Sequence, residues 1–224
     1  MMERPASGAE GSAGPEGGRE APALGGGSGA ARRFAPGVLA ALFLSTPALA
    51  NMDEALTTCL DTTLTIETRA HTLTQSGWTP SQDQTLAISS LAHGVLFGSL
   101  DAQAPEKWAD DQTWAQKVAQ GLRDKRGFDG VTFLTTDQAT LTLEKNRSGQ
   151  DTCLYTGNDA DLAAVYAVID ATTPSRTGPL QHIRGEAKKA VVLAYALDAD
   201  QADAFPEPLS FTSTFTVVLD RGGV

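Results

Sequence analysis

The chain has two cysteines, and a bond between them would constrain the fold more than any other feature of the sequence. Cys59 lies in a segment whose apolar residues recur every three or four positions, which is typical of an amphipathic helix. Cys153 lies near the end of 139–155, where two alternating runs flank a polar turn, a pattern typical of a hairpin. An even cysteine count in an exported chain predicts a Cys59–Cys153 disulfide, which would fasten the first helix to the middle of a sheet. Two buried free thiols are the alternative.

The first 50 residues predict an export signal preceded by a leader. Residues 1–31 are rich in Gly, Ala, Glu, Ser and Pro, so we interpret them as a disordered leader or the product of a mis-set start codon. Residues 32–50 carry an Arg pair, a short apolar run and the triplet Ala48-Leu49-Ala50, which is the order found in secretory signals. We therefore expect cleavage before Asn51 and a periplasmic or secreted protein, with no stable membrane insertion after signal cleavage.

Residues 51–224 have a length typical of one domain and an acidic composition. The four basic and four acidic residues of 1–50 cancel, so 51–224 keeps the formal net charge of −10 of the whole chain. Such a surface repels nucleic acid and anionic lipid. We therefore expect a single domain whose partner is an unknown protein or a small ligand and not a nucleic acid. The sequence does not indicate an oligomeric state.

The spacing of apolar residues changes from three or four to two near Gly130. Before it, the spacing predicts helices over 52–73, 81–97 and 105–126. After it, alternation predicts strands over 131–135, 139–145, 152–156, 190–197 and 209–219. One further helix is predicted over 159–171. Helices grouped ahead of strands favour an α+β fold, with an antiparallel sheet of about five strands and helices packed on one face. Thr140, Thr142 and Glu144 would lie on the other face, where we expect them to meet water or a partner.

The sequence contains no recognisable catalytic or metal-binding motif. The three histidines, His71, His93 and His182, lack the close spacing of metal ligands, so we expect no metal and no cofactor. His93 follows Ser89 and Ser90 by one helical turn, and His182 lies in a predicted loop, so either histidine could act as a general base. Because no G-x-S-x-G or S-x-x-K accompanies them, the sequence favours a protein that is not an enzyme.

The three tryptophans are candidates for a ligand groove or for the core. Trp78 follows the first predicted helix, and Trp108 and Trp114 lie on the helix predicted over 105–126. Trp108 lies at one edge of the apolar arc of that helix. The core is the favoured place for these tryptophans, and Trp108 is the aromatic side chain we expect to bind a ligand if one of them is exposed.

These features favour an exported, single-domain, non-catalytic module that binds a partner protein or a small ligand. One alternative is a hydrolase with scattered catalytic residues, in which His93 or His182 is the base. The other alternative is an envelope component that assembles with itself.

Overall fold

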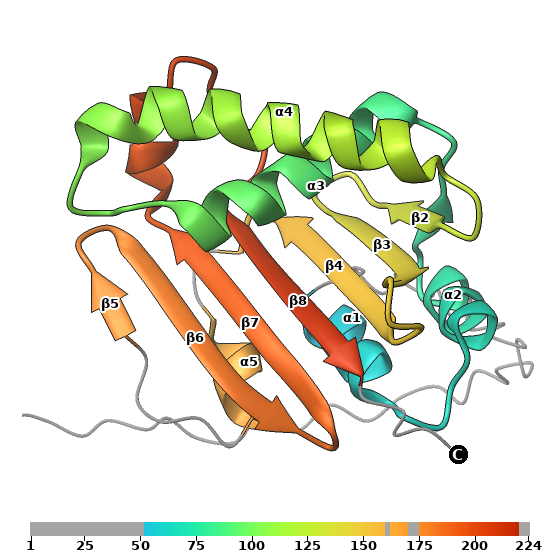
Figure 1. Ribbon diagram of the computed structural model, residues 1–224. Helices are drawn as coiled ribbons and strands as arrows, with labels where there is room; N and C mark the ends of the chain where they lie inside the picture. Colours follow the sequence, from blue (N-terminus) through green and yellow to red (C-terminus); the bar gives the residue numbers. More distant parts are fainter. Residues whose placement is uncertain (1–51, 160–161, 170–174, 220–224) are drawn as a thin grey trace, which may run out of the picture. The chain divides into compact units, whose positions relative to one another are not determined.

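The computed structural model describes residues 52–159, 162–169 and 175–219, which form one antiparallel sheet of eight strands with helices on both faces (Figure 1). Across the sheet the strands are β1 (Thr79–Pro80), β2 (Thr132–Thr135), β3 (Thr140–Lys145), β4 (Asp151–Gly157), β8 (Ser213–Leu219), β7 (Ala190–Leu197), β6 (Leu180–Ala187) and β5 (Ser175–Thr177). The predicted α+β class and antiparallel sheet are confirmed, and the sheet is larger than the five strands expected. The predicted leader and signal lie outside the described residues.

The central strand β8 lies between β4 and β7 and joins the two halves of the sheet. Because side chains alternate along a strand, each row of paired residues belongs to one face. We call the face that carries Leu143, Cys153 and Val217 the disulfide face. The opposite face, which carries Thr142 and Leu154, is the threonine face.

Three helices cover the disulfide face: α1 (Met52–Leu60), α2 (Ile66–Gln75) and α5 (Ala163–Val168) (Figure 1). Their apolar side chains and those of the strands form one buried cluster, which includes Leu56, Leu73, Leu141, Val165 and Phe215. The first helical part of the chain therefore packs against strands that are far away in the sequence.

The predicted disulfide between Cys59 and Cys153 is present and ties α1 to β4, with 6.1 Å between the two Cα atoms. A disulfide is compatible with a periplasmic or extracellular protein. Within the described ranges, no helix has both the length and the apolar character needed to span a bilayer.

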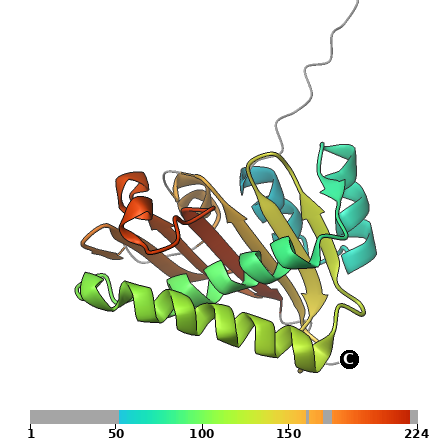
Figure 2. The ribbon, with the colours of Figure 1, turned by 90° about the horizontal axis from the view of Figure 1, so that it is seen from above.

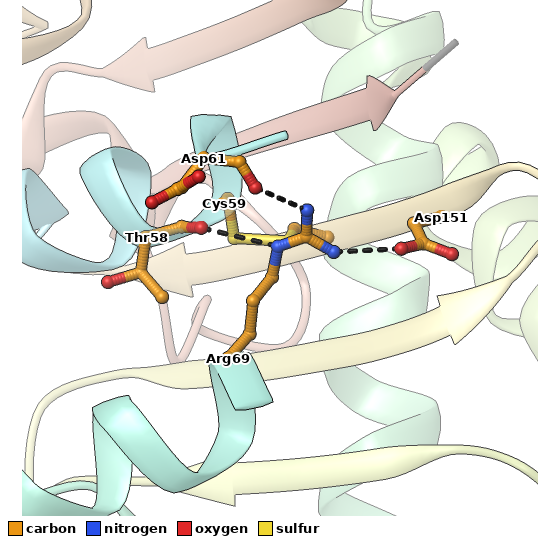
Figure 3. Close-up of a disulfide and its surroundings, with 6 residues drawn as sticks. Thr58, Cys59, Asp61, Arg69 and Asp151 are labelled. Atoms are coloured by element: carbon orange, nitrogen blue, oxygen red, sulfur yellow. Dashed lines mark hydrogen bonds and ion pairs between the residues drawn. A yellow bond between two sulfur atoms is a disulfide. The ribbon is translucent and has the colours of Figure 1, made fainter. Parts of the chain in front are cut away.

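The side chain of Arg69, on α2, lies beside the disulfide and is fully buried (Figure 3). Its guanidinium donates hydrogen bonds to the carbonyl oxygens of Thr58 (3.3 Å) and Asp61 (2.7 Å) and to Asp151 Oδ2 (2.8 Å). The last carbonyls of a helix have no partner within it. Arg69 therefore caps the C-terminal end of α1 and links it to the start of β4.

The threonine face is covered by α3 (Gln84–Ser99), and α4 (Trp108–Arg126) packs on the outer side of α3 (Figure 2). A short 3-10 helix, η1 (Pro105–Lys107), leads into α4. Gly94 lets α3 approach the sheet closely, because a Cβ there would lie 2.9 Å from Leu154 Cδ1. Helices thus cover both faces of the sheet, whereas the prediction placed them on one face.

A network of hydroxyl groups lies between α3 and the sheet. Thr140 Oγ1 donates to Ser90 Oγ (2.8 Å) and lies 2.7 Å from Thr156 Oγ1. Ser90 Oγ lies 3.1 Å from Thr156 Oγ1. The expectation that Thr140 and Thr142 meet water was wrong, because both are buried beneath α3.

The single helix predicted over 52–73 is two helices in the structure. Asp61 Oδ1 accepts hydrogen bonds from the backbone N–H and the hydroxyl of Thr63. Thr65 then accepts from the Thr68 N–H as the N-cap of α2. Short polar side chains of this kind compete with helical hydrogen bonds and favour turns and caps. The Asp-Thr-Thr-Leu-Thr segment therefore interrupts a pattern of apolar residues that is otherwise helical.

The largest error in the predicted strands concerns β6, which was not predicted. Its buried residues Leu180, Ile183 and Ala187 do not alternate, so the strand is defined by its pairing with β7 and not by its own pattern. The helix predicted over 159–171 is represented by α5, with parts of that range outside the described residues. A 3-10 helix, η2 (Ala199–Ala204), follows β7.

Candidate functional site

A cavity of about 190 Å³ lies between α3, α4 and the segment that precedes β8. From α3 it is lined by residues on one helical stripe: Thr85, Ile88, Ser89, Ala92, His93 and Leu96. From α4 and the segment before β8 it is lined by Gln112, Ala115, Gln116 and Leu209. Residues three or four apart share one side of a helix, so each helix presents one stripe to the cavity.

Two glutamines of α4 bind the segment that contributes Leu209 to the cavity wall. Gln112 Nε2 donates to the carbonyl oxygen of Glu207 (2.7 Å), and Gln112 Oε1 accepts from the Glu207 N–H (3.4 Å). Gln116 Nε2 donates to Glu207 Oε2 (3.0 Å). These bonds anchor the chain two residues before Leu209, whose side chain lines the cavity.

The imidazole of His93 is the buried titratable group of this site, with 8% of the residue exposed. Its Nδ1 lies 2.8 Å from the carbonyl oxygen of Ser89. A carbonyl only accepts, so Nδ1 carries the proton and Nε2 is left with a lone pair. Nε2 is buried and has no hydrogen-bond partner among the described residues. The ring meets Phe211 edge-on, at 5.4 Å between centroids.

Burial lowers the pKa of His93, and its hydrogen bond to the Ser89 carbonyl acts in the opposite direction. Burial is the larger cause, so the ring is neutral at pH 7. Among the described residues no Asp, Glu, Lys or Arg lines the cavity. The site is therefore a small, mainly apolar space without a formal charge on its wall.

The serines that could accompany His93 as nucleophiles are placed differently. Ser89 lines the cavity, and its backbone orients the imidazole. The Ser90 hydroxyl is directed to the sheet, where it bonds to Thr140 and Thr156. A His base in hydrolases of the Ser-His-Asp type is oriented by a carboxylate. Here a carbonyl holds the ring, which fixes the tautomer without stabilising an imidazolium to the same extent.

The other two histidines lie away from the cavity. His182, on β6, stacks on Tyr195 of β7, with 6.3 Å between ring centroids. His71 is exposed on α2, and its Nε2 lies 3.1 Å from Gln75 Nε2. Within the described part of the chain, no three His, Cys, Asp or Glu side chains gather as metal ligands would.

The structure places Trp108 in the core and exposes Trp114 instead. Trp108 is 2% exposed and stacks on Phe205, with 4.9 Å between centroids, and its Nε1 donates to the Asp101 carbonyl oxygen (3.0 Å). Trp114 is 51% exposed. Trp108 belongs to the same apolar cluster as the cavity residues Leu96 and Ala115 but does not line the cavity. Its proposed ligand role stays a prediction.

A second hollow lies at the end of the β6–β7 hairpin and has a volume of about 590 Å³. It is open, and its lining includes Arg184, Glu186, Lys188 and Lys189. Lys188 and Lys189 have φ angles of 47° and 66°, as the two central residues of the tightest hairpin turns do. The cavity between α3 and α4 resembles a ligand site more closely, because such sites are concave and mainly apolar with few polar groups.

One sequence pattern marks this cavity. Thr85, Ser89 and His93 follow one another at intervals of four on α3, which places polar groups on one stripe of an otherwise apolar helix. Gln112 and Gln116 repeat that interval on α4.

Comparisons of the chain with models of protein families, with curated proteins and with solved structures gave no match.

Proposed function

We propose that this chain is an exported, non-catalytic binding module whose ligand occupies the cavity between α3 and α4. The observation that carries the proposal is a cavity of about 190 Å³ with a mainly apolar wall, a neutral imidazole and a few hydroxyl and amide groups. Binding pockets for small molecules have this composition.

Export is supported by two independent features. The order of an Arg pair, an apolar run and Ala48-Leu49-Ala50 matches a secretory signal. The Cys59–Cys153 disulfide needs an oxidising compartment to persist. N-terminal sequencing of the protein from its native host tests this part: we expect Asn51 as the first residue, and a retained Met1 would contradict it.

A binding role is favoured over catalysis by the way His93 is held. Its Nδ1 is bonded to a backbone carbonyl and its Nε2 is buried, so the ring is positioned as a neutral wall group and not as a proton carrier. General base catalysis requires the lone pair to reach the proton that it removes.

A thermal-shift screen against small metabolites tests the binding role, because a ligand that binds only the folded state raises its apparent stability. Ala92→Leu fills the cavity, and Ala109→Leu makes the same change at an exposed position of α4. We expect a ligand that stabilises the protein to lose its effect with Ala92→Leu and to keep it with Ala109→Leu. A ligand that stabilises both variants equally binds elsewhere.

A further inference from the structure

We propose that the cavity selects a small, uncharged, ring-sized molecule that is mainly apolar and carries one hydroxyl or amide group. This inference rests on the proposed function, because it names the class of ligand for the same cavity. Three properties of the described residues lead to it: the size of the cavity, the charge of its wall and the state of its polar groups.

The size of the cavity limits the ligand to about one ring. Pockets for drug-sized ligands hold about 300–1,000 Å³, whereas this cavity holds about 190 Å³. An apolar cavity of about 150 Å³ suffices for benzene. A nucleotide, a sugar chain or a peptide would therefore leave most of its surface outside.

The charge of the wall excludes ions. Among the described residues no formally charged side chain lines the cavity, and burial keeps His93 neutral. Burying a carboxylate or an ammonium group without a partner is far more costly than burying a hydroxyl. The Glu207 carboxylate, which is bonded to Gln116, is exposed, so solvent screens it and it offers no buried counter-charge to a cation in the cavity.

The polar groups of the wall favour one hydrogen-bonding group on the ligand. Gln112 binds the Glu207 backbone through both Nε2 and Oε1, and Gln116 Nε2 donates to the Glu207 carboxylate. Thr85 and Ser89 also line the cavity, and each carries a hydroxyl group. Each can donate or accept, so together they fit a hydroxyl or an amide.

Four probes of similar size test the class: toluene, benzyl alcohol, benzoate and benzylamine. The readout is the methyl NMR spectrum of the full, disulfide-bonded protein, in which Ala92, Leu96, Ala115 and Leu209 report on the cavity. We expect benzyl alcohol to shift these methyl signals in a saturable manner. Its affinity should exceed that of benzoate and benzylamine by at least about tenfold, because the cavity offers no counter-charge. Toluene should bind more weakly than benzyl alcohol.

The outcomes separate this inference from the proposed function. Equal or tighter binding of benzoate or benzylamine at the same methyl groups overturns the ligand class and leaves a binding cavity in place. Toluene binding as tightly as benzyl alcohol overturns the need for a hydrogen-bonding group. If none of the four probes shifts the cavity methyl groups, both the class and the binding function are overturned. Because the methyl groups locate the site in the unaltered protein, the result does not depend on a variant that folds.

Discussion

Arg69 Nη1 lies 2.8 Å from Asp151 Oδ2, and the two side chains are 0% and 2% exposed. Asp151 also accepts a hydrogen bond from Lys145 Nζ at 2.9 Å. The pair joins α2 to the start of β4, and the disulfide joins α1 to the same strand. Removing Arg69 would take the buried partner from Asp151, whose other cation, Lys145, is 59% exposed, and would take the guanidinium from the Thr58 and Asp61 carbonyl oxygens.

We therefore expect Arg69→Met to lower the free energy of unfolding by about 3–5 kcal/mol. Arg69→Lys should recover only part of this loss, because an ammonium group lacks the planar fork that reaches two carbonyls and a carboxylate. Arg126→Met is the matched control, since Arg126 lies 4.0 Å from Glu144 and is 31% exposed, and exposed pairs contribute about 0–1 kcal/mol. Urea unfolding followed by circular dichroism measures all three. Equal losses for Arg69→Met and Arg126→Met would contradict the role of the buried pair.

The disulfide closes a separation of 94 residues, so its loss should be costly. A protein with both Cys59→Ala and Cys153→Ala should unfold with a free energy lower by about 2–5 kcal/mol. Urea titration of the two proteins gives the difference. Alkylation of the unfolded protein without reductant should give no adduct, and after reduction two thiols should react. Two adducts before reduction would show that the bond is absent.

His93 should make stability depend on pH. Its pKa in the folded protein is lowered from 6.5, so below about pH 6.5 the unfolded chain binds more protons than the folded one. The contribution of His93 to the free energy of unfolding should then be constant above about pH 6.5. Below that pH, stability should fall as the pH falls. The measurement is urea unfolding at a series of pH values between about 7.5 and 5.

His93→Leu should reduce the slope of stability against pH in that window, because leucine does not titrate. His71→Gln, at an exposed position of α2, is the comparison variant, and the change in slope caused by His93→Leu should exceed the change that it causes. If His93→Leu leaves the slope unchanged, the buried imidazole is not its source.

Two helical glycines should respond to alanine in opposite directions. At Gly121, on α4, an added Cβ meets no atom within 4 Å, so Gly121→Ala should stabilise the protein by up to about 1 kcal/mol. At Gly94 the added Cβ lies 2.9 Å from Leu154 Cδ1, and overpacking costs about 1–3 kcal/mol. We expect Gly94→Ala to destabilise the protein, and to cost less when Leu154→Ala is also present. Urea unfolding of the unaltered protein, the two single variants and the double variant tests whether the packing of α3 depends on this close approach.

The parts of the fold that could be predicted from the sequence are those with a local cause. The strand predicted over 190–197 coincides with β7, because residues 190–197 form an unbroken apolar run that is typical of a central strand. The Cys59–Cys153 bond could be predicted because these are the two cysteines of the chain. The covering of Thr140 by α3 could not, since it depends on a hydroxyl bond to Ser90, 50 residues away. A threonine row facing a helix has the same alternation as one facing water.

The candidate cavity was beyond prediction for a similar reason. One part of its wall is Leu209, whose segment is held by the bonds between Gln112 and Glu207, 95 residues apart. In the sequence, nothing about a glutamine or a glutamate indicates that the two residues bind each other. His93 was named as a candidate base, but its burial and its bond to the Ser89 carbonyl follow from tertiary packing. Only the interval of four between polar residues on α3 was readable in advance.

The central place of β8 has a consequence for how the chain folds during synthesis. Residues 213–219 leave the ribosome after the other seven strands of the described part of the chain, yet they supply the hydrogen bonds that connect β4 to β7. A chain made from its N-terminus therefore holds two unjoined half-sheets, each with an open edge, until this last strand arrives. Truncation before residue 213 would leave the edges of β4 and β7 permanently open, which is a direct route to aggregation.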